Sequence, residues 1–149
     1  MTDATMSQFV YVTFIRTTPE QLWSALTSPD IMRKYWFGMH QESDWQIGAS
    51  WRLLRKDGSV TDTGEVVEID PPRRLVLKWR NEFRPELKSE GYAHCTYEIE
   101  PMDGSVKLTI THGMDRPGTK FIEAVSGGWP RILSNLKSLL ETGEPVLKN

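Results

Sequence analysis

The stretch SGGWPRILSNLKSLLETG, residues 126–143, combines helix-breaking residues with a strong amphipathic helix pattern. Pro130 removes one main-chain hydrogen bond and crowds the preceding turn, whereas Gly143 is a typical helix end. Apolar residues nevertheless keep helical spacing through the break, at Phe121, Val125, Trp129, Leu133, Leu136 and Leu140. We therefore predict one long helix that is kinked at Pro130 and not split. Its first half would roof a cavity and its second half would anchor the core.

Two shorter helices are indicated near the N-terminus, in TTPEQLWSALTSPDIMRKYW, residues 17–36. Thr18 followed by Pro19 is a helix start signal, and the tripeptide SPD at residues 28–30 repeats it. Residues 9–16, ahead of both helices, are rich in β-branched and aromatic types and predict a strand.

Residues 41–112 show a period of two and frequent turn signals, which is typical of an antiparallel meander. One hairpin is expected around the two prolines at residues 71–72, and another around Asp103 and Gly104. The second turn fixes three cross-strand pairs: Cys95 with His112, Tyr97 with Ile110, and Ile99 with Leu108. Because paired residues share a face of the sheet, these side chains are expected on the apolar face beneath the long helix.

The predicted element order is one strand, two short helices, about six antiparallel strands and one long helix. A sheet with one apolar face and a helix with one apolar stripe bury these surfaces against each other. The length of 149 residues is close to the commonest size for one domain. We predict a single α+β domain over residues 1–149, with a cavity where the helix fits a curved sheet poorly.

Composition narrows the class of partner. The net charge of -2 gives no electrostatic reason to expect nucleic acid or an anionic membrane as the partner. The single cysteine, Cys95, cannot form an intramolecular disulfide. The N-terminal residues lack the basic region and cleavage site of a signal peptide, and no apolar run is long enough to span a membrane. We expect a soluble, cytoplasmic protein.

Motifs for catalysis, cofactors or metals are not evident. The segment GMDRPGTK, residues 113–120, resembles a phosphate-binding loop, but its lysine follows Gly118 one residue too late and its context is not a βαβ unit. His40, His94 and His112 are too scattered to predict a zinc site from their spacing. We therefore expect no cofactor, no metal and no recognisable catalytic set.

Two polar groups have alternative interpretations. Cys95 beside His112 could be a thiol and base near the opening of a cavity, or a buried cysteine next to a core histidine. Glu65 could face inward if Ile69 pairs with Leu75, or lie on the solvated face like most acids in such strands. The core interpretation is favoured for the cysteine, because no third residue orients the pair.

The six tryptophans are many for a domain of this size. Leu77 and Trp79 alternate onto the face opposite Lys78, which is expected to be the apolar one. Large aromatic side chains with one polar atom suit the wall of a ligand pocket, although they also suit an ordinary core.

Three segments, residues 17–36, 64–79 and 127–143, resemble the activator of heat-shock protein 90 ATPase homologue family. That family lies within the START-like superfamily, which includes polyketide cyclases and birch-allergen proteins. The resemblance covers residues 9–143 and implies a helix-grip fold, in which a curved sheet of six to seven strands wraps the C-terminal helix around a hydrophobic cavity. The eukaryotic activator adds an N-terminal chaperone-binding domain, for which this chain has no room.

Transferred residue by residue, the resemblance places seven side chains at or near the cavity: Trp36, Trp79, His112, Phe121, Val125, Trp129 and Leu133. Trp51, Leu77 and Tyr97 complete the candidate ligand-binding set. The leading hypothesis is binding of a small hydrophobic or aromatic molecule, oriented by His112 or Tyr97. The alternatives are a cyclase- or hydrolase-type enzyme, and a protein-interaction role as a chaperone-associated stress-response protein or as a homodimer joined at a sheet edge.

Overall fold

The computed structural model describes residues 6–148 and contains seven strands and four helices in this part of the chain. The first segments are β1 (Ser7–Ile15), α1 (Pro19–Thr27), α2 (Pro29–Tyr35), β2 (His40–Ser43), β3 (Ser50–Leu54) and β4 (Val60–Asp70). They are followed by β5 (Arg74–Asn81), α3 (Pro85–Lys88), β6 (Ala93–Pro101), β7 (Val106–Met114) and α4 (Lys120–Thr142). Within residues 6–148, no helix combines the length and the apolar character needed to cross a membrane.

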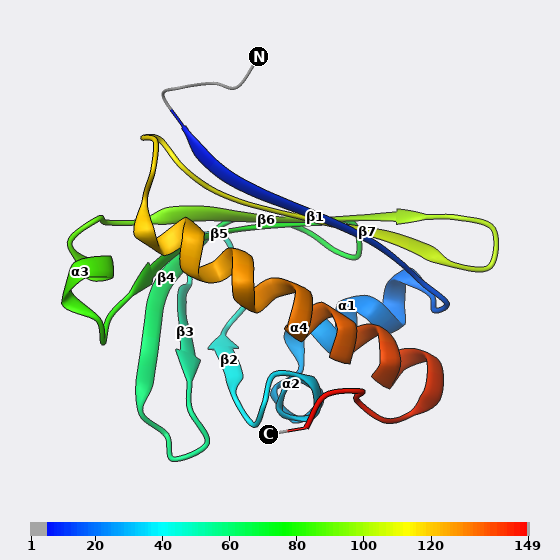
Figure 1. Ribbon diagram of the computed structural model, residues 1–149. Helices are drawn as coiled ribbons and strands as arrows, with labels where there is room; N and C mark the ends of the chain where they lie inside the picture. Colours follow the sequence, from blue (N-terminus) through cyan, green and yellow to red (C-terminus); the bar gives the residue numbers. More distant parts are fainter. Residues whose placement is uncertain (1–5, 149) are drawn as a thin grey trace.

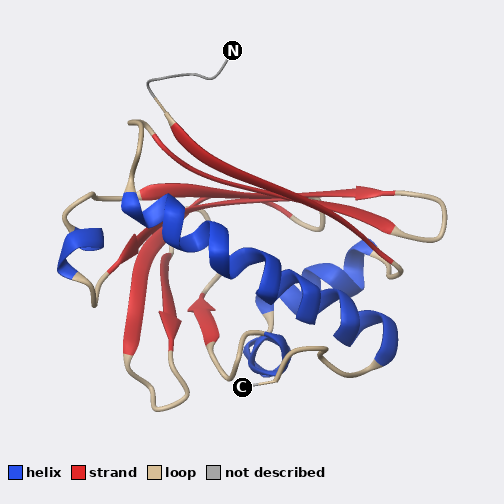
Figure 2. Ribbon diagram, viewed as in Figure 1, coloured by secondary structure: helices blue, strands red, loops and turns tan. Residues whose placement is uncertain are grey.

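All seven strands form one antiparallel sheet in the order β1-β7-β6-β5-β4-β3-β2. In Figure 1 the strands β6, β7 and β1 run along one side of α4, and β4, β3 and β2 descend beside its first half. The two layers are also clear in Figure 2, where α1 lies behind the second half of α4 and α2 lies below α4. The predicted α+β helix-grip fold is therefore confirmed.

The helix boundaries follow the start and stop signals of the sequence. Thr18 caps α1 by accepting from the main-chain N–H of Gln21 at 3.1 Å. Gly143 ends α4 in the left-handed region, with φ of 91°. The helix α4 is continuous through Pro130, which confirms one unbroken helix, while the expected kink stays a prediction.

Helix α3 interrupts residues 41–112, where we predicted only an antiparallel meander. It is a single turn of four residues that begins at Pro85, so it is too short to show a helical period in the sequence.

A row of alternating large and small residues crosses the inner face of the sheet. Trp51 pairs with Gly64, and Gly64 pairs with Trp79, which in turn pairs with Ala93. With no side chain at residue 64, the two indole rings meet with their centroids 4.4 Å apart. A Cβ atom at Gly64 would overlap the main-chain oxygen of Lys78 and press on the ring of Trp51. Glycine is thus required at residue 64, because the main chain of Lys78 and the ring of Trp51 both pack closely against it.

The β6–β7 hairpin has the predicted register, with Cys95 opposite His112. His112 is fully buried, and its Nδ1 accepts a hydrogen bond of 3.0 Å from the indole nitrogen of Trp129. The neutral ring therefore carries its proton on Nε2. Burial lowers the pKa of His112 to about 3, and burial raises the pKa of the Cys95 thiol. A protonated thiol beside a weakly basic imidazole is what the core interpretation predicts. It is not the state of a nucleophile and its base.

The inward orientation of Glu65 is wrong. Ile69 does pair with Leu75, but a bulge between Val66 and Glu68 shifts the alternation of the strand. Glu65 consequently lies opposite Lys78 on the outer face.

The strand β1 forms one edge of the sheet and exposes Val10, Val12 and Phe14 on its outer face. Part of this edge is covered, because Lys137 of α4 donates to the main-chain oxygen of Phe14 at 2.6 Å. Homodimer formation through this edge stays a prediction.

Replacing Gly64 with alanine should destabilise the protein by about 2–4 kcal/mol, because the new methyl group overlaps fixed backbone. Gly127→Ala is the matched control: residue 127 is exposed in α4, and nothing lies within 4 Å of a Cβ there. Alanine at 127 should raise stability by up to about 1 kcal/mol. Urea denaturation of the two variants measures both effects, and equal stabilities would contradict the close-packing explanation.

His112 should make the protein less stable as the pH falls. Below about pH 6.5 the unfolded chain binds a proton at this histidine, but the folded protein does not until about pH 3. The free energy of unfolding should therefore decrease by about 1.4 kcal/mol per pH unit in this interval because of His112 alone. His112→Gln keeps an acceptor for Trp129 and should reduce this slope between pH 6.5 and 4.

His94→Gln, on the exposed face of β6, is the matched control for replacing a histidine with glutamine. Denaturant titrations at several pH values compare the three proteins. If the wild type and His112→Gln lost stability in parallel, the buried neutral state of His112 would be incorrect.

Candidate functional site

A pocket of about 350 Å³ lies between the first half of α4, the segment around α3, and the ends of β4 and β5 that face it. Helix α4 contributes Phe121, Ala124, Val125, Gly128, Trp129 and Ile132. The sheet contributes Leu53, Asp62, Trp79 and Asn81, and the segments around α2 and α3 contribute Trp36, Met39, Phe83, Arg84 and Leu87. In Figure 1 this region is where α3 stands beside the start of α4.

Five of the ten predicted site residues line this pocket: Trp36, Trp79, Phe121, Val125 and Trp129. The aromatic members are in contact with one another. Trp79 lies 6.2 Å from Trp36 and 5.8 Å from Trp129, measured between ring centroids. Three indoles, one from the residue that caps α2 and the others from β5 and α4, therefore meet at the pocket.

The other five predicted residues are in the closed core and do not line the pocket: Trp51, Leu77, Tyr97, His112 and Leu133. The position expected for His112, near the opening of the cavity, is wrong because Trp129 and Phe121 cover its ring. The predicted residues of the sheet do lie on its apolar face, but that face extends beyond the pocket. Leu133 belongs to the second half of α4, and the predicted sheet residues near it face this tightly packed part of the helix.

Asp62 and Asn81 are polar residues of the pocket that sequence reasoning missed. They pair with each other across β4 and β5, one row beyond Gly64 and Trp79. Both are buried, with relative exposures of 6% and 7%. The alternation of Leu75, Leu77 and Trp79 could have identified Asn81, since the next inward position is 81. Asp62 could not be found in this way, because the β4 bulge breaks the alternation.

The Asp62 carboxylate accepts a hydrogen bond of 2.8 Å from the indole nitrogen of Trp79. Burial raises the pKa of the Asp62 carboxyl above its ordinary value. Hydrogen bonds from its neighbours, including Trp79 and Asn81, oppose that effect on the pKa. In residues 6–148 no lysine, arginine or histidine forms an ion pair with Asp62. A buried acid without a cation is a typical feature of functional sites.

The α3 segment closes one side of the pocket and is tied to α4. Asn81 Oδ1 accepts from the main-chain N–H of Arg84, at the start of α3. Glu90, which follows α3, accepts from the main-chain N–H groups of Lys120 and Phe121 at 2.8 and 2.9 Å. The carboxylate therefore caps α4 from a distant part of the chain and holds the pocket's wall against its roof.

Positive charges lie around the rim. The Arg84 side chain lines the pocket and donates to Glu86 at 2.8 Å. The Arg55 guanidinium lies 4.5 Å from the ring centroid of Phe83, another lining residue. The rim thus combines aromatic surface with two cationic groups.

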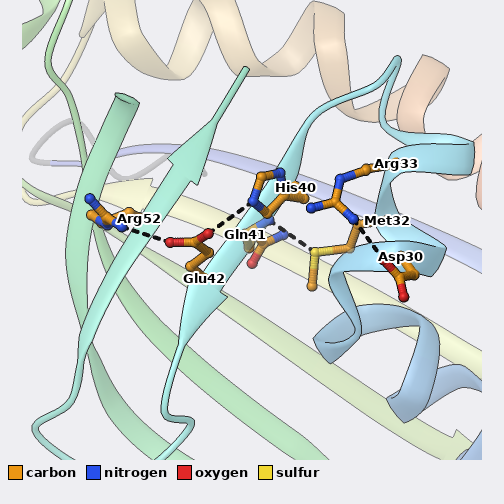
Figure 3. A network of polar contacts seen from close by, with 7 residues as sticks. All are labelled: Asp30, Met32, Arg33, His40, Gln41, Glu42 and Arg52. Atoms are coloured by element: carbon orange, nitrogen blue, oxygen red, sulfur yellow. Dashed lines mark hydrogen bonds and ion pairs between the residues drawn. The ribbon is translucent and has the colours of Figure 1, made fainter. Parts of the chain in front are cut away.

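A second polar cluster lies on β2 and β3, away from the pocket (Figure 3). Glu42 accepts from Arg52 at 2.6 Å and from His40 at 3.1 Å, and these hydrogen bonds lower the pKa of the Glu42 carboxyl. Gln41 points to the opposite face, where it accepts from the indole of Trp51 at 2.8 Å. The charges balance within this cluster, so it joins the last two strands of the sheet and offers no free acid.

Metal chemistry finds no support in the described part of the chain, where no three His, Cys, Asp or Glu residues are grouped to hold an ion.

Comparisons with known structures show the same fold in several proteins of similar length. A protein from Mesorhizobium loti has 23% identity and a TM-score of 0.77, covering 91% of this chain and 97% of that one. An HSP90 activator from Plasmodium falciparum has 25% identity and a TM-score of 0.73, covering 90% and 96%. The Aha1 dimer from Colwellia psychrerythraea has 19% identity and a TM-score of 0.73, covering 92% and 98%.

Sequence comparison gives a family but no individual relative. No curated protein matches this chain. The model of the family described as Activator of Hsp90 ATPase homolog 1-like protein matches residues 16–141, which is most of the chain. Together with the helix-grip architecture, this match shows that the chain belongs to the Activator of Hsp90 ATPase homolog 1-like family, as the resemblance of its three segments predicts.

Proposed function

We propose that this protein binds a small apolar, ring-containing molecule in the pocket between α3, α4 and the β4–β5 ends. The observation that carries the proposal is the meeting of Trp36, Trp79 and Trp129 at the wall of an open pocket of about 350 Å³. Pockets for small molecules fall between about 300 and 1,000 Å³ and are mainly apolar and aromatic, with a few polar groups. This pocket has each of those properties.

The pocket is held open by the fold itself. Hydrogen bonds fix its aromatic wall, because the indole of Trp79 donates to Asp62 and that of Trp129 donates to His112. Its roof has no side chain at Gly128, where a Cβ atom would meet nothing within 4 Å. A ligand would therefore enter a preformed site and lose little binding energy to ordering the protein.

Filling the pocket from its roof should abolish binding without unfolding the protein. Gly128→Leu places a side chain in the pocket, whereas Gly127→Leu places the same side chain on the exposed surface of α4. We expect Gly128→Leu to weaken binding of the fluorescent probe 1-aminoanthracene by about tenfold or more, and Gly127→Leu to leave it within about twofold. Probe fluorescence during a titration gives the affinities.

Thermal unfolding of the same variants serves as the control for folding. Both substitutions replace a helical glycine, so neither should lower stability through the helix backbone. Equal probe affinities in the two variants, or no probe binding to the wild type, would refute the proposed site.

A further inference from the structure

The three central indole N–H groups have different acceptors. Trp51 donates to the amide of Gln41, Trp129 to the imidazole of His112, and Trp79 to the carboxylate of Asp62. Gln41 and His112 show that a neutral acceptor is enough to satisfy an indole. Asp62 is the acceptor that also lines the pocket, so its carboxylate needs an explanation beyond Trp79.

A neighbouring acid, Glu82, has two cations beside it. Glu82 follows Asn81, and it pairs with Arg80 at 2.6 Å and with Lys88 at 3.2 Å. Asp62 has no such partner in residues 6–148, although it is more deeply buried. A carboxylate offers about four lone-pair positions: the Trp79 indole takes one of them at 2.8 Å, and Thr61 and Asn81 are the other hydrogen-bonding neighbours that lower the pKa of Asp62. Acceptor capacity is therefore left on the side of the pocket.

Asn81 supplies the complementary donor. Its Oδ1 accepts from the main-chain N–H of Arg84 at 2.9 Å, which leaves its NH₂ group as the donor that lowers the pKa of Asp62. An NH₂ group has two hydrogens, so it can serve both Asp62 and a ligand. The paired residues on β4 and β5 thus present an acceptor and a donor side by side in an otherwise mainly apolar pocket.

Resting on the proposed function, we infer that the ligand carries a hydroxyl group on its apolar ring system, which donates to the Asp62 carboxylate and accepts from the Asn81 amide. A hydroxyl group both donates and accepts, whereas a ketone or ether only accepts and an ammonium group only donates. Phenols and ring alcohols are therefore the ligand class.

Three two-ring probes separate these possibilities: naphthalene, 2-naphthol and 2-naphthylmethylamine. Their affinities for the intact protein are measured by equilibrium dialysis at pH 7. We expect 2-naphthol to bind about tenfold more tightly than naphthalene, the ratio that corresponds to one added hydrogen bond. The amine should bind more weakly than 2-naphthol.

The variant Asp62→Asn tests the residue. Its one side-chain oxygen can still accept from Trp79, and an NH₂ donor then replaces the second carboxylate oxygen toward the pocket. We expect this variant to lose the roughly tenfold preference for 2-naphthol over naphthalene, whatever its affinity for naphthalene itself. Asp103→Asn, in the exposed β6–β7 turn, is the matched control and should keep the preference.

Equal binding of naphthalene and 2-naphthol by the wild type would overturn the inference, as would a preference that survives in Asp62→Asn. Tighter binding of the amine than of 2-naphthol would overturn it in favour of an ion pair with Asp62. If none of the three probes bound the wild type, the proposed function itself would be wrong, and this inference would fall with it.

Discussion

The close approach of Trp51 and Trp79 over Gly64 is the constraint on which the rest of the structure depends. Because residue 64 has no side chain, the two indoles meet on the inner face and Trp79 reaches the centre of the domain. From there it contacts both Trp36 and Trp129 and bonds to Asp62. One missing side chain in the sheet therefore fixes the aromatic wall of the pocket and positions its buried acid.

Helix α4 serves two different purposes along its length. Its second half packs Leu133 and Leu136 into the closed core, and Asn135 bonds to the main chain of Leu147. The first half covers a pocket and presents Gly128, where a larger residue would occupy the space. A hydrophobic stripe alone does not distinguish these halves, since both halves bury apolar side chains. The difference comes from the sheet, which packs closely against one half and leaves room under the other.

Local patterns predicted most of the fold, whereas only five of the fifteen residues that line the pocket were among the predicted site residues. The turn at residues 103–104 gave the β6–β7 register, and the stripe of α4 gave one apolar helix face, while the family resemblance placed Phe121, Val125 and Trp129 near a cavity. The extent of the pocket could not be read from these patterns, because it depends on α3 and on the β4 bulge. Both are single irregularities of a few residues, without a period. The bulge moved Glu65 to the outer face, and the polar end of the pocket is formed by Asp62 and Asn81.

The central claim is that a ligand binds beside Trp79 and not elsewhere on the protein. The indole N–H signals of the six tryptophans in a ¹H–¹⁵N spectrum test it most directly, during titration with 2-naphthol. The signals of Trp36, Trp79 and Trp129 should shift together and saturate, because their rings line the pocket. Those of Trp23 and Trp45, which do not line it, should stay in place. Unmoved pocket signals, or equal shifts at all six tryptophans, would contradict the account.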